Sequence, residues 1–452
     1  MNIIIIGCGQ VGSTLTGQLS SENHNVTVID TDAKKVRKVA GNFDVMGVCG
    51  NGISIKTLKE AGVEEADILI AVTESDEVNL LCALMAKKVG DCKTIARVRN
   101  HVYSGETEFI KEQLELSMII NPDLATAKEI SQLVKYPSAQ NIDSFANGRI
   151  QLVKVKIKPD SLLAGTEVRE ISSKINVELL VCAVERGDEV IIPYGSTRIL
   201  AGDTVSFVTS KDKINDVFKS LSLTYKPIKT AMIVGGDRIA YYTSKMLSDT
   251  GIRVKIIEND PTRCEHLDEI LPEVTVICGD GTDKALLTDE GIDAAGAFIA
   301  ITNIDEENIF LSMFAKEVSN AKLVSKVDRL AFDNIIENLD IGSVVYPNYI
   351  TADYIMQFVR SRQNSAGNNI ATLYRLLGTK VEALEFVVHE NSPVIGKPLM
   401  ELDLKKDLLV CSICRGDKII IPGGHDTIEK GDSVIIVTLQ SGLQDISNIL
   451  KD

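Results

Sequence analysis

The sequence predicts an α/β protein that contains two doubly wound parallel sheets, each followed by a small β-rich α+β domain. Three observations support this fold class. The chain repeats itself at an interval of 228 to 229 residues, short apolar runs alternate with helical patterns in the first part of each copy, and a glycine-rich turn follows the first apolar run. At 452 residues the chain is also too long for one ordinary domain.

The internal repeat extends over both parts of each copy. Matching residue types recur in the same order and with nearly the same spacing, which indicates a duplicated two-domain unit. The matched positions include Gly7 with Gly235, Asp30 with Glu258, Asn51 with Asp280, Thr73 with Thr302, and Arg186-Gly187-Asp188 with Arg415-Gly416-Asp417. We therefore expect four domains, at residues 1–138, 139–224, 228–362 and 370–452.

The first part of each copy has the pattern of a doubly wound sheet. In the first copy the apolar, β-branched runs are residues 3–6, 26–29, 45–48, 68–72 and 94–98. Their alternation with helical patterns predicts parallel strands with helices on both faces of the sheet. A helix that begins near Pro122, or near Pro347 in the second copy, is expected to close each such domain.

The second part of each copy predicts short alternating strands and a hairpin. Residues 152–157 alternate in polarity, and Arg186-Gly187-Asp188 separates two apolar runs. The polar stretches 136–148 and 361–369 lack apolar periodicity and contain Gly, Ser and Asn, so they are expected to be linkers. The segment 226–229 is the expected joint between the two copies.

Composition and charge exclude several classes of protein. With 44% hydrophobic and 25% charged residues, the chain has the composition of a globular protein rather than a disordered one. Its net charge of −15 repels phosphate backbones and argues against a nucleic-acid partner. No apolar run approaches the ~18 to 20 residues that a membrane-spanning helix needs, and no basic leader precedes the first strand. We therefore expect a cytoplasmic protein.

The nine cysteines and five histidines predict neither a disulfide framework nor a metal site. An odd number of scattered cysteines is typical of reduced thiols in the cytoplasm. Cys411 and Cys414 form a C-x-x-C pattern inside a predicted strand, where residues three apart face opposite sides. We therefore expect that these two thiols cannot easily share a metal or a disulfide.

A dinucleotide-binding pattern follows the first strand. The segment Gly7-Cys8-Gly9-Gln10-Val11-Gly12 opens a helix, so that Gly7 permits a tight turn, Gly9 lets a pyrophosphate approach the backbone and Gly12 allows close helix packing. The amides at this helix N-terminus are expected to hold the phosphates. Asp30 ends the second strand 18 residues after Gly12, where a carboxylate accepts hydrogen bonds from a ribose diol. A carboxylate there disfavours a 2′-phosphate, so the pattern favours NAD(H) or a plain adenine nucleotide over NADP(H).

Further candidate ligands of the first site follow the later strands. Asn51, Thr73 and Glu74 lie at the carboxyl ends of predicted parallel strands, where ligands of open α/β sheets bind. Loops of this kind also favour Asn and Thr for purely structural reasons. Arg97, which is followed by Arg99, is expected to reach a phosphate or a neighbouring subunit, or else to be solvated or salt-bridged as arginines near strand ends often are.

The second copy departs from this pattern. Its turn reads Gly235-Gly236-Asp237-Arg238-Ile239-Ala240, with Asp237 in place of Gly9 and Ala240 in place of Gly12. A carboxylate beside the phosphate position repels pyrophosphate, whereas alanine is a tolerable substitute in helix packing. Glu258, Asp280 and Lys326 keep the positions of Asp30, Asn51 and Arg97. The second site therefore binds a less charged or differently placed nucleotide, or it is degenerate.

The sequence lacks a recognisable catalytic constellation. Neither β-rich domain offers clustered His, Lys, Tyr or Cys residues with the spacing of a dehydrogenase or a nucleophilic catalyst. Glu185, Arg186, Asp188 and Asp203, together with their copies, are interpreted as turn residues because Gly-Asp pairs suit hairpins.

These segments together resemble a known family. With residues 3–12, 73–79, 96–99 and 185–205 in view, the chain resembles the regulator-of-potassium-conductance family. The tandem arrangement is similar to that of the peripheral subunits of Trk potassium uptake systems. The resemblance covers essentially the whole chain, and both domains in duplicate are much more specific than the glycine motif alone.

The resemblance implies a partner and a set of ligands. It implies a homo-oligomeric ring, a tetramer by analogy, that docks on the inner face of the cell membrane under a potassium channel subunit resembling TrkH. Such a ring gates its channel in response to NAD(H), ATP or ADP. The helices at Pro122 and Pro347 are expected to cross to a partner domain and so to build the dimer interfaces. Carry-over assigns Gly7 to Gly12, Asp30, Thr73, Glu74 and Arg97 to the first nucleotide site, whereas Asp237 breaks the match in the second.

We therefore expect a nucleotide-sensing regulator rather than an enzyme. A nucleotide with different affinities for two arrangements of the domains would shift the population between them, and the channel would read the result. The alternative from another class is an NAD-dependent oxidoreductase of unknown substrate. A third interpretation, an interaction protein with vestigial sites, predicts no thermal stabilisation by any nucleotide.

Overall fold

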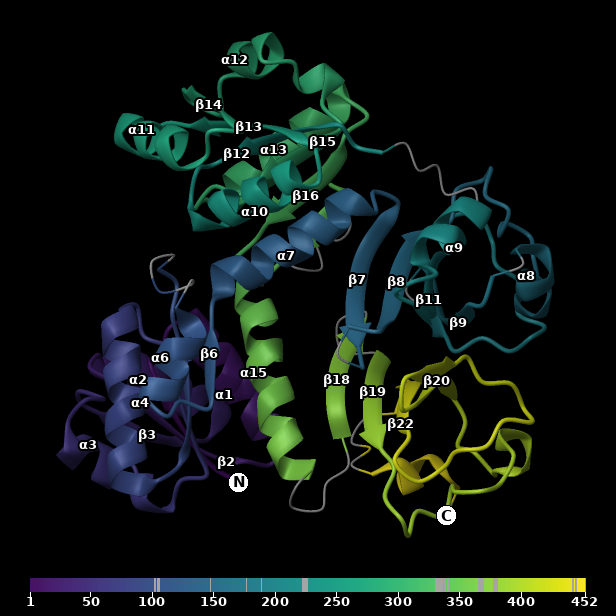
Figure 1. Ribbon diagram of the computed structural model, residues 1–452, viewed down its shortest axis with the longest axis horizontal. Coiled ribbons are helices and arrows are strands. Elements are labelled where there is room, and N and C mark those ends of the chain that lie inside the picture. The colour runs from purple at the N-terminus through teal and green to yellow at the C-terminus, as the bar shows by residue number, and fades with distance from the viewer. Residues whose placement is uncertain are drawn as a thin grey trace. The chain divides into compact units, whose positions relative to one another are not determined.

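The computed structural model describes residues 1–100, 103, 106–146, 148–175, 177–187, 189–221, 227–329, 336, 339, 341–364, 370–376, 381–440, 443 and 445–451. The chain forms two compact units, and each unit contains one piece from either copy. The first consists of Met1–Ser131 with Lys229–Val359, and the second of Gln132–Ile228 with Arg360–Asp452. Figure 1 labels the elements of both.

The first copy contributes a six-stranded sheet to the first unit, in the order β3-β2-β1-β4-β5-β6, and all its strand pairs are parallel. The order reverses beside β1, as in a doubly wound fold. All five strands predicted from the sequence are therefore confirmed. The elements are β1 (Asn2–Ile6), α1 (Gln10–Ser21), β2 (Asn25–Asp30), α2 (Ala33–Phe43), β3 (Met46–Cys49), α3 (Ile55–Glu60), η1 (Val63–Glu65), β4 (Ile68–Ala71), α4 (Asp76–Gly90), β5 (Lys93–Arg97), α6 (Thr107–Gln113), β6 (Met118–Ile120) and α7 (Pro122–Lys135).

The second copy contributes an equivalent parallel sheet to the same unit, in the order β14-β13-β12-β15-β16-β17. The tandem duplication inferred from the sequence thus extends to the strand order. The elements are β12 (Thr230–Val234), α10 (Arg238–Asp249), β13 (Arg253–Glu258), α11 (Pro261–Ile270), β14 (Thr275–Cys278), α12 (Lys284–Asp289), η2 (Ile292–Ala294), β15 (Ala297–Ala300), α13 (Asp305–Val318), β16 (Lys322–Lys326), β17 (Ser343–Val345) and α15 (Pro347–Asn364).

Alternating side chains of β1 show how helices cover both faces of the first sheet. Ile4 and Ile6 belong to a core that includes Leu58 of α3 and Cys82 of α4. Ile3 and Ile5 point to the opposite face, because successive side chains of a strand alternate between the two sides. The core on that face combines α1 and α2 with a helix from the other copy.

That helix is α15 of the second copy, which packs on the first copy's sheet. In return, α7 of the first copy contacts the second copy within the same unit (Figure 1). Ile355, Met356 and Val359 of α15 are fully buried in the same cluster as Ile3 and Ile5. In the other direction, two contacts join the α7 region to α10: Asn121 Nδ2 donates to Tyr242 Oη at 3.1 Å, and Ser131 Oγ lies 3.6 Å from Met246 Sδ. The partner domain that each closing helix reaches is therefore the other copy in the same chain.

The second unit contains two antiparallel five-stranded sheets, in the orders β10-β9-β11-β8-β7 and β18-β19-β22-β20-β21. One apolar cluster includes residues of both sheets, among them Phe145 and Val437. The elements are β7 (Ala139–Phe145), β8 (Ile150–Lys156), α8 (Val168–Ile175), β9 (Leu180–Arg186), β10 (Glu189–Ile191), β11 (Thr204–Ser210), α9 (Ile214–Ser220), β18 (Ile370–Leu376), β19 (Val381–Val387), η4 (Leu399–Glu401), β20 (Leu408–Arg415), β21 (Lys418–Ile420), β22 (Ser433–Thr438) and η5 (Ile446–Ile449).

The two predicted linkers are wrong over much of their length. Residues 139–145 form the edge strand β7, which pairs with β8. A register shift between Ala139 and Asn141 breaks the alternation, and Ala139, Ile142 and Phe145 are buried at every third position. This spacing hides the strand from a period-two search. Residues 361–364 belong to the last turn of α15, and residues 365–369 lie outside the described part of the chain.

One part of the expectation for Cys411 and Cys414 is wrong, namely that they face opposite sides of their strand; both are free thiols. A register shift between Val410 and Ser412 interrupts the pairing of β20 with β22. Such a bulge inserts an extra residue, so side chains three apart return to the same face. Both thiols are accordingly buried in the cluster that the two sheets share. Among the described residues, no group of three or more His, Cys, Asp or Glu side chains is arranged to hold a metal.

The turn residues of the small domains form an ion pair. Arg186 Nε and Nη2 donate to the two carboxylate oxygens of Asp203 at 2.9 and 2.8 Å, and Arg415 and Asp432 repeat the arrangement. The predicted hairpin is confirmed, because Arg186 pairs with Glu189 across β9 and β10. Asp188 lies outside the described residues. No helix in the described part of the chain is both long and apolar enough to span a membrane.

Removing buried surface from the exchanged helix tests its contribution to the first unit. Ile355→Ala is expected to lower the free energy of unfolding of that unit by about 2–5 kcal/mol, because it deletes a fully buried side chain that cannot be replaced locally. The matched control is Ile55→Ala, at a side chain that is 47% exposed. Urea titration followed by circular dichroism measures both, and equal effects would contradict the packing role of α15.

Candidate functional site

The glycine-rich turn of the first copy contains one glycine that the fold itself does not need. Gly7 has φ +107°, and a Cβ there would lie 3.0 Å from the backbone of Val72 and Thr73. A Cβ at Gly12 would lie 1.8 Å from the carbonyl oxygen of Gly7. At Gly9, by contrast, an added Cβ meets nothing within 4 Å. The space beside Gly9 is therefore open to a ligand.

Asp30 is positioned beside this turn by the end of β2. Its Oδ2 accepts from the Cys8 amide at 2.7 Å, and its Oδ1 accepts from the Asp32 amide at 2.9 Å. The carboxylate is half-buried and keeps lone pairs for further donors, as ribose recognition requires. Burial, followed by the charge of Asp30, raises the pKa of the Cys8 thiol to about 12, so this cysteine stays protonated and is a poor nucleophile.

Asn51 takes part in the turn after β3. Its Oδ1 accepts from the Ile53 amide at 3.0 Å, and its carbonyl oxygen accepts from the Ser54 amide at 2.9 Å. The side chain is exposed. The structure thus gives Asn51 a clear structural function, as loop-forming asparagines often have.

Asn79, which the sequence analysis did not single out, connects the loops after β4 and β5. It is fully buried, its Oδ1 accepts from the amide and the hydroxyl of Thr73 at 2.8 and 2.7 Å, and its Nδ2 donates to the carbonyl oxygens of Thr73 and Arg97 at 3.0 and 2.9 Å. Asn308 makes the corresponding bonds to Thr302 and Lys326. The recurrence of this asparagine at the repeat interval was the available sequence signal.

Arg97 is a cation that forms no ion pair with the described residues. Its Nη2 donates to the Thr73 carbonyl oxygen, while its Nε is buried and makes no hydrogen bond to any described residue. No described carboxylate lies within ion-pair distance of it, whereas the neighbouring Arg99 binds both oxygens of Asp123 at 2.9 Å. Burial, and then the charge of Arg99, lowers the pKa of Arg97, while the charges of Asp76, Asp123 and Glu74 act in the opposite direction.

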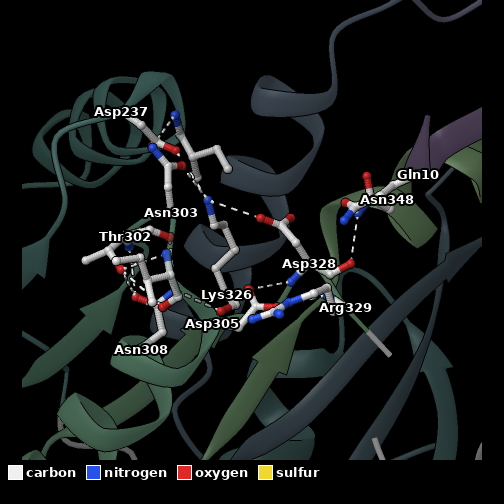
Figure 2. Close-up of polar contacts among 12 residues, drawn as sticks. Gln10, Asp237, Thr302, Asn303, Asp305, Asn308, Lys326, Asp328, Arg329 and Asn348 are labelled. Carbon is white, nitrogen blue, oxygen red and sulfur yellow. Dashed lines mark hydrogen bonds and ion pairs between the residues drawn. The ribbon is translucent and has the colours of Figure 1, made fainter. Parts of the chain in front are cut away.

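The corresponding turn in the second copy has the same backbone but already contains an anion (Figure 2). Asp237 caps α10, and its Oδ1 accepts from the amides of Ile239 and Ala240 at 2.9 and 3.1 Å. Burial raises the pKa of Asp237, while Lys326 and these amides act in the opposite direction. The phosphate-binding amides of a Rossmann-type turn are therefore engaged by the protein's own carboxylate.

Lys326 lies between two carboxylates in the same close-up (Figure 2). Its Nζ is 3.6 Å from Asp237 Oδ2 and 3.6 Å from Asp328 Oδ2, and its side chain is only 4% exposed. Nζ also donates to Asn303 Oδ1 at 3.3 Å. The cation that corresponds to Arg97 is thus neutralised within the second copy.

The other candidate residues of the second copy keep the geometry of the first. Glu258 Oε2 accepts from the Gly236 amide at 2.6 Å, which repeats the bond from Cys8 to Asp30. Gly235 has φ +101°, like Gly7. Asp280 Oδ1 accepts from the Thr282 amide at 2.9 Å and is exposed, so it repeats the loop-forming contact of Asn51.

The remaining predicted residues differ in what their side chains do. Val11 and Ile239 are buried in the cores, so that only their backbone faces the turn, while Glu74 and Arg238 are exposed. Gln10 reaches the other copy: Asn348 Nδ2, at the start of α15, donates to Gln10 Oε1 at 2.7 Å and to the Asp328 carbonyl oxygen at 3.0 Å. The first turn is therefore in direct contact with the exchanged helix (Figure 2).

Fold and site together define the class: duplicated Rossmann-type domains with a nucleotide-type glycine turn, each followed by a small β-rich domain. The TrkA-N domain model matches residues 3–122 and 231–347, and the TrkA-C domain model matches residues 152–222 and 383–451. The chain belongs to the family of TrkA proteins of Trk potassium uptake systems, and the resemblance noted from the sequence is confirmed.

Full-length relatives support this assignment. The chain is 33% identical over 443 residues to the Trk system potassium uptake protein TrkA of Haemophilus influenzae, across 96% of this chain and 95% of that protein. It is 32% identical over 452 residues to the TrkA homolog of Archaeoglobus fulgidus, across 100% of both. The solved structure of the GsuK channel bound to NAD matches 97% of this chain and 77% of that one, with a TM-score of 0.63 and 17% identity, which shows a shared fold.

The paired asparagines provide a stability test of the site. Asn79→Ala and Asn308→Ala are each expected to lower the free energy of unfolding of the first unit by about 1–3 kcal/mol, because buried amide and hydroxyl groups lose their partner. Asn25→Ala removes an exposed amide and should change it by less than about 0.5 kcal/mol. Urea denaturation measures all three variants, and an effect at Asn79 no larger than at Asn25 would contradict the bridging role.

Proposed function

We propose that this protein is a nucleotide-sensing regulatory subunit that gates a membrane potassium uptake channel. Two observations carry the proposal: the open space beside Gly9, and the cation of Arg97, whose Nε has no hydrogen-bond partner among the described residues. Helix N-terminal amides and an arginine are the donors that phosphates prefer. The names of the full-length relatives give the physiological context, which is potassium uptake.

The residues at this turn fit an adenine nucleotide such as NAD(H), ADP or ATP. The amides that follow Gly9 and the guanidinium of Arg97 would hold the phosphates, and Asp30 would accept hydrogen bonds from the ribose. Thr73, Glu74 and Asn51 border the same carboxyl edge of the sheet and complete the proposed site. Because no transition state has to be stabilised, these residues need only bind, and the nucleotide acts as a signal rather than as a reactant.

The contact between Gln10 and Asn348 offers a route from ligand to channel. Phosphates bound at the start of α1 would lie beside Gln10, and Gln10 is hydrogen-bonded to the first turn of α15. A nucleotide that binds more tightly to one packing of α15 on the first domain shifts the population toward that packing. The two Rossmann-type domains of the chain would then transmit the change as one unit.

The proposed partner is an integral-membrane potassium channel subunit of the TrkH type. The regulator would lie peripherally on the inner face of the cell membrane, as part of a homo-oligomeric ring with four chains by analogy with the family. Its net charge of −15 disfavours direct adhesion to anionic lipids, so the contact is expected to be made with the channel protein.

Binding at the first turn is tested by placing the second copy's carboxylate there. Gly9→Asp is expected to weaken ADP and NADH binding by roughly 100-fold or more, because a carboxylate would occupy the phosphate position. The variant should fold, since Asp237 adopts φ −75° and ψ −173° where Gly9 has −71° and −167°. Gly9→Ala is the uncharged control. Isothermal titration calorimetry measures affinity, and unchanged binding by Gly9→Asp would contradict the proposed site.

The regulatory function is tested by rubidium uptake, with rubidium as a tracer for potassium. Deleting the gene is expected to abolish or strongly reduce regulated uptake, the native gene should restore it, and Gly9→Asp should restore uptake that no longer responds to nucleotide. Gly9→Ala serves again as the control. Uptake that is indifferent to deletion would overturn the proposal and would redirect the search to substrates of an NAD-dependent oxidoreductase.

A further inference from the structure

We propose that the second Rossmann-type domain carries a built-in substitute for the ligand phosphate, the carboxylate of Asp237, and therefore excludes phosphate-bearing nucleotides. Each chain would then bind one nucleotide, at the first turn only. The inference rests on the proposed function. It states that the first copy binds the nucleotide and that the second copy does not respond to it.

The two turns differ in a side chain rather than in backbone conformation. Gly9 and Asp237 have nearly the same dihedral angles, −71° and −167° against −75° and −173°. At Gly9 no side chain caps the helix, and the space around an added Cβ is empty. At Asp237 a carboxylate occupies that same position and accepts hydrogen bonds from two amides of α10, at 2.9 and 3.1 Å.

Helix capping alone does not account for this arrangement. Asp32, Asp260 and Asp283 cap α2, α11 and α12, and all three are exposed residues. The side chain of Asp237 is only 17% exposed, and its partner Lys326 is 4% exposed. Asp237 and Lys326 thus form a largely buried pair at the turn where a ligand would bind, whereas the other three caps lie at the surface.

The balance of charge also differs between the copies. In the first, Arg97 has no carboxylate within ion-pair distance among the described residues, and Arg99 is paired with Asp123. In the second, Lys326 already lies 3.6 Å from each of two carboxylates, Asp237 and Asp328. A nucleotide phosphate would have to enter beside an anion that holds the amides and half-neutralises the lysine. Like charges placed this close strongly disfavour binding.

The test counts nucleotides per chain by isothermal titration calorimetry with ADP, using the full-length protein. The native chain is expected to bind one equivalent, and Gly9→Asp none. Asp237→Gly should bind two, the second more weakly because Asp328 stays beside Lys326 where the first copy has Arg99. The double variant Gly9→Asp with Asp237→Gly should bind one equivalent, which assigns the gained site to the second copy.

Loss of the cap is expected to lower the melting temperature of Asp237→Gly by about 1–2 °C, because glycine is itself a tolerated N-cap, so the variant should remain folded. Asp237→Asn keeps the side-chain volume without the charge, and it should gain weak binding even if the glycine variant is unstable. Two equivalents in the native chain, one of which survives Gly9→Asp, would overturn the inference and leave the proposed function intact. One equivalent in both Asp237 variants would also overturn it. No binding of ADP, ATP or NADH to the native chain would instead overturn the proposed function.

Discussion

Burial of α15 against the first sheet is the constraint on which the first unit depends. One face of that sheet is completed by Ile355, Met356 and Val359, which belong to the other copy. A Rossmann-type domain cut from this chain at the repeat boundary would leave an apolar surface open to water, at a considerable cost in free energy. The two Rossmann-type domains therefore share one buried core.

The two glycine-rich turns have the same backbone geometry but differ in the charges beside them. Both have a turn with a left-handed glycine, both have a carboxylate that accepts from the turn, and both have a buried asparagine that joins the next two loops. The difference lies in the ion pairs of the basic residue at the end of the fifth strand. Lys326 lies 3.6 Å from the carboxylate of Asp237, whereas Arg97 forms no ion pair with the described residues. The two copies thus differ in charge balance, because Lys326 lies 3.6 Å from two carboxylates, Asp237 and Asp328.

Much of this could be predicted from the sequence, because the repeat, the glycine turn and the strand-helix alternation are all local signals. The errors arose where local signals fail. Strand β7 was missed because a register shift makes its buried residues recur every third position, and a bulge in β20 brought Cys411 and Cys414 to one face against the rule of alternation. The sequence analysis also predicted that Asp237 would repel phosphate, but the ion pair with Lys326 joins elements far apart in the chain and has no local signature.

The exchange of helices within one chain also bears on how such a protein can evolve. In a symmetric dimer of identical subunits, any substitution appears on both sides of the interface, so a mutation that closes one pocket closes its mate as well. Covalent fusion of the two halves removes that obligation, and it keeps them paired at a high effective concentration. Gene duplication followed by fusion would therefore free one half to drift while the other stays under selection, and an aspartate could become fixed in one turn without loss of the other.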